Sequence, residues 1–170
     1  AWFFKCTIYN ILNFGNNGLQ GMEKKINQIK SSLIKIVLFG PESTGKSTLS
    51  NALAKHYKSV CVPEYARDFL QSKWDMYRKT CEKKDLWAIA KGQEKLENEI
   101  SKKANRVLFC DTNLLQTKLY SEIYYEGYCD PRIEKSATEN YYDLYFLCDV
   151  DIPWVPDDLR DKPNERVIMF

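Results

Sequence analysis

One segment of eight consecutive residues has a spacing of residue types that can bind phosphate: Gly40-Pro41-Glu42-Ser43-Thr44-Gly45-Lys46-Ser47. It fits the P-loop pattern G-x-x-x-x-G-K-[ST], which should arise by chance in well under about 1% of chains of this size. The glycines let backbone N–H groups curl around phosphate oxygens, and the helix that follows adds its partial positive charge. Lys46 is expected to reach the β- and γ-phosphates, and the Ser47 hydroxyl to ligate Mg²⁺. The sequence therefore predicts a site for ATP with Mg²⁺ formed by Gly40, Glu42, Ser43, Thr44, Gly45, Lys46 and Ser47.

Three acidic residues, Glu64, Asp111 and Asp149, follow apolar runs that are typical of buried strands. Ligands of an open α/β sheet bind outside the carboxyl ends of its strands, so we expect these acids at the same edge as the P-loop. Asp111 comes directly after Val-Leu-Phe-Cys, as the second Mg²⁺ residue of P-loop enzymes does, and would act directly or through water. It could also cap a helix beginning near Asn113. Asp149 is a weaker candidate because acids at strand ends often cap turns.

Glu64 and Arg67 form a possible acceptor site for the reaction. A carboxylate at position 64 could accept the proton of an attacking hydroxyl, while Arg67 could hold negative charge on a substrate or phosphate. The alternative is a surface pair at a helix start, because the two residues are three apart.

A late segment adds two arginines and a tryptophan. Arg160 and Arg166 could neutralise charge on a moving phosphoryl group, as arginines commonly do in phosphoryl transfer. A surface salt bridge of Arg160 with neighbouring aspartates is the competing interpretation. Trp154 lies between two prolines and is either a stacking surface for a flat ring or a core residue.

Apolar runs that alternate with helical patterns must position these residues. The runs at 33–39, 59–62, 106–110 and 144–148 predict strands, and helices are expected over 46–57, 64–70 and 84–103. Two further helical segments should divide near Gly127 and Asp130-Pro131. This order predicts an α/β fold, a three-layer P-loop NTPase fold with a mostly parallel sheet flanked by helices.

Prolines refine these boundaries. Pro63 suits a first helical position and so favours the helix expected through 64–70. Pro163 can open a last helix, and the chain stops inside that helix at Phe170. The two prolines beside Trp154 exclude regular helix there. We expect residues 1–30 to lie outside the domain, with Met22 as the natural start, and residues 31–170 to form a single domain.

Composition excludes several function classes. The chain has 170 residues, 44% of them hydrophobic and 28% charged, which is the balance of a soluble globular protein. Its net charge of +2 comes from interleaved Lys and Glu rather than a basic stripe, so we expect no nucleic-acid partner. No apolar stretch is long enough for a membrane span, and no membrane partner is expected. The six cysteines show no C-x-x-C spacing and there is one histidine, which argues against zinc and for reduced thiols in a cytoplasmic protein.

Four segments together resemble the ribosylnicotinamide kinase domain of NadR-type proteins, a P-loop kinase and AAA-like ATPase domain family. They read GPESTGKSTL, PEYARDFL, VLFCDTNLLQT and YDLYFLCDVDIPWVPDDLRDKPNERVIMF, and the similarity runs from about residue 35 to 170. The P-loop is shared with many unrelated proteins, whereas the PEYAR and DIPWVPD-x-LRD segments are selective. The resemblance implies transfer of the ATP γ-phosphate to the 5′-hydroxyl of nicotinamide riboside, which gives nicotinamide mononucleotide for NAD salvage.

The resemblance also implies roles for single residues. Thr48 joins Gly45, Lys46 and Ser47 in the ATP-binding loop. By similarity to related nucleoside kinases, Glu64, Arg67 and Asp111 line the nucleoside site, with Glu64 the first choice for the base and Asp111 the partner on the magnesium side. Trp154 falls where an aromatic ring could lie against nicotinamide, and Arg160 and Arg166 match the lid.

The chain departs from this family in two ways. It has no His-x-Gly-His-type signature of an adenylyltransferase domain, so the sequence does not support a second, NAD-forming activity. The family continues past the position of Phe170 with a further strand and helix, and we expect this chain to be truncated there.

Two other functions remain open from the sequence. One is a regulatory P-loop ATPase, although no Asn-Lys-x-Asp segment of a GTPase is present and Asp111 is followed by Thr112 rather than a second acid. The other is a kinase of a different nucleoside or small metabolite, which would share the fold and the P-loop.

Overall fold

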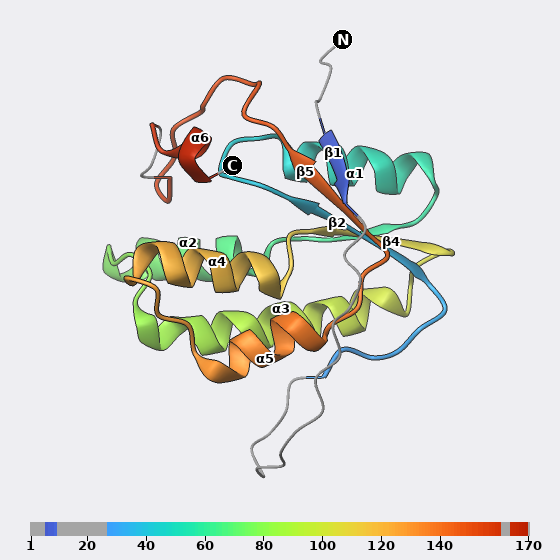
Figure 1. Cartoon of the computed structure of the whole chain (residues 1–170), viewed down its shortest axis with the longest axis horizontal. Coiled ribbons are helices and arrows are strands. Elements are labelled where there is room, and N and C mark those ends of the chain that lie inside the picture. Colours follow the sequence, from blue (N-terminus) through green and yellow to red (C-terminus); the bar gives the residue numbers. More distant parts are fainter. Residues whose placement is uncertain (1–5, 10–26, 161–163, 170) are drawn as a thin grey trace.

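A five-stranded sheet forms the centre of the computed structural model, which describes residues 6–9, 27–160 and 164–169 (Figure 1). Within these residues the strand order is β1-β5-β2-β4-β3. Strands β5, β2, β4 and β3 run parallel, and β1 pairs antiparallel with β5 at one edge. The bounds are Cys6–Tyr9 for β1, Ile34–Phe39 for β2, Val60–Val62 for β3, Val107–Asp111 for β4 and Leu144–Cys148 for β5. The predicted mostly parallel sheet is confirmed.

Helices cover both faces of this sheet. Figure 1 shows α1 on one face and α3, α4 and α5 on the other, so the predicted three layers are confirmed. Helix α2 packs against α3. The bounds are Lys46–His56 for α1, Tyr65–Tyr77 for α2, Leu86–Ser101 for α3, Leu114–Tyr124 for α4, Pro131–Glu139 for α5 and Arg166–Met169 for α6, with a 3₁₀ turn, η1, at Lys83–Asp85.

Neighbouring residues of the central strand β2 pack against helices on opposite faces of the sheet, because side chains alternate along a strand. Val37 belongs to the core cluster against which Leu96 of α3 packs. Leu38 belongs to the opposite cluster, against which Leu53 of α1 packs. Both strand residues are fully buried, and burying such a side chain stabilises the fold by about 1.5–3 kcal/mol. These two interfaces fix the P-loop between β2 and α1.

The structure corrects two boundary predictions. Pro63 lies outside α2 rather than at its first position, because Glu64 is extended at the N-cap and the helix begins at Tyr65. Cys6–Tyr9 belong to the sheet, although we expected residues 1–30 to lie outside the domain. Without β1, β5 would be an edge strand with unpaired N–H and C=O groups, and an extended segment can pair with such groups. Pro163 lies outside the described residues.

Five of the cysteines that the structure describes form no disulfide: Cys61, Cys81, Cys110, Cys129 and Cys148. Two of them, Cys110 and Cys148, are buried in the sheet as small apolar side chains. Among the described residues, no helix has the length and apolar character needed to cross a bilayer.

A polar cluster is buried between α3 and the start of β2, at the end of that strand away from the P-loop. Lys35 Nζ lies 2.9 Å from Glu97 Oε1, and the Tyr142 hydroxyl donates to Glu97 Oε2 at 2.7 Å. Asn140 donates to Glu94 Oε2 at 2.8 Å, but Glu94 Oε1 is buried with no hydrogen-bond partner among the described residues. Burial, reinforced by the Glu97 charge, raises the pKa of Glu94 to about 7.

Replacing Glu94 with glutamine should stabilise the fold at pH 8 and change little at pH 5. The folded protein keeps a proton on Glu94 between the ordinary pKa of 4.5 and about 7, so stability is lost as pH rises through that window. Removing the charge should raise the free energy of unfolding by about 1–3 kcal/mol at pH 8. Urea unfolding at the two pH values measures this, with Glu99→Gln, exposed on the same helix, as control. An equal gain at both pH values would contradict a charged Glu94.

Candidate functional site

The P-loop conformation requires glycine at two places. Gly40 has φ 136°, and a Cβ there would lie 2.7 Å from the carbonyl oxygen of Cys148 at the end of β5. Gly45 has φ 80° and directly precedes Lys46, the first residue of α1. Only glycine adopts these positive φ values without strain. The loop therefore turns directly from the end of β2 into the N-terminus of α1, where the helix favours a negative charge.

The remaining predicted loop residues divide into buried and accessible ones. Thr44 is 1% exposed, and its hydroxyl donates to a carbonyl inside the loop at 2.9 Å. Glu42 and Ser43 are half-buried, whereas Ser47 and Thr48 are exposed in the first turn of α1. Thr44 thus stiffens the loop, and the Ser47 and Thr48 hydroxyls remain accessible to a ligand.

Lys46 folds back over the loop. Its Nζ donates to the carbonyl oxygens of Gly40 and Pro41 at 2.8 and 2.6 Å. Burial lowers the pKa of Lys46, and the carboxylates of Glu64 and Asp111 oppose this shift. The lysine is therefore held by hydrogen bonds at the loop, within the electrostatic reach of both predicted acids.

Gln116 of α4 fixes the first glycine of the loop, a contact that the sequence analysis missed. Its Oε1 accepts from Gly40 N at 3.3 Å, and its Nε2 donates to Gly40 O at 3.2 Å. The side chain is only 7% exposed. A lone polar residue inside a helical pattern gives no signal of such a long-range contact. Gln116 thereby satisfies both backbone groups of Gly40 and holds the loop to α4.

The predicted metal ligands Ser47 and Asp111 meet. Asp111 ends β4, pairs with Leu38 of β2 and is 4% exposed. Burial raises its pKa, and a hydrogen bond with the Ser47 side chain together with the Lys46 charge opposes that rise. The Asp111 Oδ1 atom is buried without a hydrogen-bond partner among the described residues. Two hard oxygen ligands beside a phosphate-binding loop fit Mg²⁺, which takes few protein ligands and completes its shell with phosphate and water.

Asp111 does not cap the following helix. Asn113 is the N-cap of α4, and its side chain accepts from the backbone N of Leu115 at 3.1 Å. The residue between them, Thr112, has φ 77°, which strains a β-branched residue by about 1–3 kcal/mol. Backbone strain of this kind gathers at functional sites, and the sequence carried no signal for it. The Asp111 carboxylate is thus left for a ligand role.

Glu64 lies at the N-cap of α2 without using its side chain as a cap. Burial raises its pKa, while the charges of Lys46 and Arg67 oppose that rise and the charge of Asp111 adds to it. Arg67 pairs with Asp157 rather than with Glu64, so the surface pair considered from the sequence does not form. The half-buried Glu64 carboxylate therefore lies within electrostatic reach of Lys46 and Asp111, and a carboxylate with a raised pKa is suited to accept a proton.

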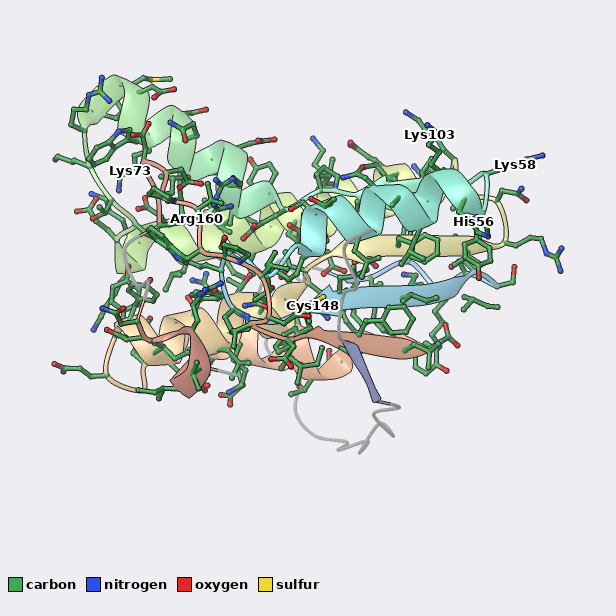
Figure 2. The ribbon with its side chains drawn as sticks, turned by 90° about the horizontal axis from the view of Figure 1, so that it is seen from above. His56, Lys58, Lys73, Lys103, Cys148 and Arg160 are labelled. Atoms are coloured by element: carbon green, nitrogen blue, oxygen red, sulfur yellow. The ribbon has the colours of Figure 1, made fainter. Side chains whose placement is uncertain are left out.

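The carboxyl ends of the parallel strands lie near the middle of the molecule, where Cys148 ends β5 (Figure 2). Figure 2 shows Cys148 where β5 ends and Arg160 beyond it, while His56 lies toward the opposite end. Asp149 follows Cys148, and its carboxylate accepts from the backbone N of Val150 at 2.7 Å. Asp149 thus caps its own turn, the alternative considered from the sequence.

Residues 149–160, here called the 149–160 segment, run past the P-loop and α2. Val155 N donates to Ser43 Oγ at 3.1 Å, which ties the segment to the P-loop. Asp157 accepts from Arg67 of α2 and lies 3.2 Å from Arg160 Nε. The charge of Arg160 also lowers the pKa of the Glu64 carboxyl, in opposition to burial. Arg160 thus forms a salt bridge and remains part of the site's electrostatics.

Arg166 and Trp154 lie on or beside the same segment. Arg166 Nη1 donates to the carbonyl oxygens of Ser43 and Ile152 at 3.0 and 3.3 Å. Trp154 is half-buried, and its indole N–H has no hydrogen-bond partner among the described residues. Of the residues near it, Val155 is bonded to Ser43 of the P-loop, and Ile152 is linked to the same loop residue through Arg166. Its role as a ring-stacking surface stays a prediction.

A groove of about 610 Å³ lies along α2, away from this site. Tyr65, Phe69 and Met76 line it together with residues around η1. These positions share one face of α2, whereas Arg67 and Gln71 contact the 149–160 segment from another face. None of the predicted site residues lines the groove.

Comparison with known proteins supports the P-loop assignment. A family model described as "AAA domain" matches residues 35–170. Two curated relatives are each 33% identical over 134 residues: the "Trifunctional NAD biosynthesis/regulator protein NadR" of Salmonella typhimurium strain LT2 and that of Escherichia coli strain K12. The matches cover 78% of this chain and 32% of each relative. The chain thus spans about a third of the length of these curated relatives.

Two solved structures share the fold. A NadR protein in complex with NAD and AMP-PNP superposes with a TM-score of 0.63 and 21% identity, over 80% of this chain and 38% of the other. A NadR protein in complex with NR gives a TM-score of 0.57 and 22% identity, over 67% of this chain and 33% of the other. At these identities the likeness establishes the fold of the chain.

Proposed function

Because the chain belongs to the AAA domain family, whose model spans residues 35–170, we propose that its P-loop serves a kinase. The reaction is transfer of the ATP γ-phosphate to the 5′-hydroxyl of nicotinamide riboside, which gives nicotinamide mononucleotide in the cytoplasm. The observation that carries this proposal is the electrostatic coupling of the half-buried Glu64 carboxylate with Lys46 of the P-loop and Asp111 at the end of β4. A kinase needs an acceptor group of this kind beside the phosphate loop.

The donor half of the site binds and orients ATP. Gly40 and Gly45 shape the loop, Lys46 stabilises charge on the β- and γ-phosphates, and Ser47 with Asp111 holds Mg²⁺. When bound, Mg²⁺ neutralises charge that develops on the phosphate oxygens. Lys46 exchanges its hydrogen bonds to the loop carbonyls for phosphate oxygens, which is a small rearrangement of a side chain already in place.

The acceptor half takes the nucleoside. Glu64 orients the 5′-hydroxyl and accepts its proton as the phosphoryl group transfers, and Arg67 binds substrate. Trp154 offers its ring to the nicotinamide. Arg160 and Arg166 neutralise charge on the phosphoryl group from the 149–160 segment and from α6.

The relatives support this choice of acceptor. The curated proteins carry NAD biosynthesis in their names, and the solved NadR structures hold NR in one case and NAD with AMP-PNP in the other. No nucleic acid or membrane takes part in the proposed reaction, which needs only a small nucleoside and ATP.

A nucleoside panel tests the acceptor. The protein is incubated with ATP, Mg²⁺ and nicotinamide riboside, uridine or cytidine, and phosphorylated products are quantified by mass spectrometry. We expect kcat/KM for nicotinamide riboside to exceed the others by at least about tenfold, which corresponds to about 1.4 kcal/mol of preference. Phosphorylation of nicotinamide riboside no faster than of uridine or cytidine would contradict its assignment as the specific acceptor.

A further inference from the structure

Gln93 of α3 makes two hydrogen bonds to the chain on either side of Glu64. Its Oε1 accepts from Tyr65 N at 2.8 Å, and its Nε2 donates to Pro63 O at 3.3 Å. The side chain is 3% exposed. Both polar ends of one buried amide are therefore used to hold the peptide groups that flank Glu64.

The start of α2 depends on this contact. The first N–H groups of a helix have no partner within the helix, and a capping side chain usually accepts from them. Gln93 accepts from Tyr65 N, the first N–H of α2, which an N-cap side chain does not normally bind. Glu64 is the N-cap residue but makes no side-chain cap bond, and its carboxylate interacts with the charges of Lys46 and Asp111 instead.

A second observation comes from the residue before Gln93. A Cβ built on Gly92 would lie 2.0 Å from the ring of Tyr65, so the first residue of α2 rests directly on the backbone of α3. No residue of α2 is buried, and the helix packs against α3. Gly92 and Gln93 thus hold the first residue of α2 against α3.

We propose that Gln93 is a positioning residue that sets the direction of the Glu64 carboxylate by holding the peptide groups on both sides of it. The proposal rests on the proposed function, in which Glu64 accepts the proton of the acceptor hydroxyl. Gln93 acts only through the backbone of the 63–65 turn. A displacement of 1 Å in such a group can cost about 10²-fold in rate.

Kinetics of Gln93→Met tests the catalytic part of the proposal. Methionine has a similar shape but cannot make either hydrogen bond. We expect kcat to fall by about 10–100-fold with KM for ATP unchanged, because the phosphate loop is held by other residues. In a Glu64→Gln background the same change should lower kcat by less than about threefold, since the group being positioned is already lost.

Asn98→Leu is the matched control. Asn98 lies near the other end of α3 and makes the same kind of clamp, accepting from Ile29 N at 2.8 Å and donating to Asn27 O at 3.1 Å. Its loss should leave kcat unchanged. Gln93→Glu keeps the shape and the acceptor for Tyr65 N, so it should recover part of the kcat lost in Gln93→Met. If Gln93→Met does not fold, Gln93→Glu replaces it in the kinetic test. The expected result is then a kcat below wild type with an unchanged KM for ATP.

Amide hydrogen exchange tests the clamp without any substrate. The Tyr65 amide should exchange at least about tenfold faster in Gln93→Met than in wild type, and at the wild-type rate in Asn98→Leu. Two results would overturn the positioning role. One is an unchanged exchange rate of the Tyr65 amide in Gln93→Met. The other is a double variant in which the kcat losses of Gln93→Met and Glu64→Gln simply multiply. Absence of nucleoside phosphorylation by the wild-type protein would instead refute the proposed function, and the exchange result would still decide the clamp.

Discussion

Replacing Lys46 with methionine should lower kcat for phosphoryl transfer by about 10³-fold. Methionine keeps the length of the side chain and removes its charge, and loss of one preorganised donor to developing charge costs about 10²–10³ in rate. Lys46 also interacts electrostatically with Glu64 and Asp111, so its removal leaves both carboxylates without one of the cations that stabilise their charge. The effect should therefore lie at the upper end of that range.

A coupled assay of ADP formation with nicotinamide riboside as acceptor measures the loss. Lys55→Met is the matched control, because Lys55 is exposed in the last turn of the same helix, and it should retain wild-type kcat. Retention of more than about a tenth of the activity by Lys46→Met would show that the loop does not hold the reacting phosphates.

Replacing Glu64 with glutamine should lower kcat by about 10²–10⁴-fold, the usual contribution of a positioned general base. Glutamine has the shape of the carboxylate but cannot accept the hydroxyl proton at neutral pH. Affinity for an ATP analogue should change by less than about threefold, because Glu64 acts on the acceptor side.

Calorimetric titration of the analogue and steady-state kinetics separate these two effects. Asp68→Asn provides the control, since Asp68 is an exposed acid in the first turn of the same helix. Full activity in Glu64→Gln would remove Glu64 from the role of base and leave Asp111 as the remaining candidate.

Local sequence patterns were sufficient to predict the parallel strands and the P-loop turn. The P-loop pattern predicted the turn between β2 and α1, and apolar runs predicted the parallel strands, because both depend on residues adjacent in sequence. Pro63 was placed at the first position of α2, two residues before the helix begins at Tyr65, since a proline suits either side of a helix boundary. Pairing of Cys6–Tyr9 with β5 could not be predicted, because an edge strand is recruited through backbone groups that every residue carries.

The site was predictable where it depends on strand ends. Asp111 and Glu64 were placed near the P-loop because parallel strands carry their carboxyl ends to one edge. Gln93 and Gln116 were missed, although each clamps a backbone segment more than twenty residues away. Long-range contacts of a buried amide depend on tertiary packing, and the residue type alone gives no indication of them.

The stoichiometry of a single reaction tests the central claim most directly. Wild-type protein is mixed with ATP, Mg²⁺ and nicotinamide riboside, and ADP and nicotinamide mononucleotide are quantified together by mass spectrometry. A kinase predicts one nicotinamide mononucleotide for each ADP, with ADP formation dependent on the nucleoside. ADP formed at the same rate without the nucleoside, with nicotinamide riboside recovered unchanged, would contradict the kinase and identify the chain as an ATPase.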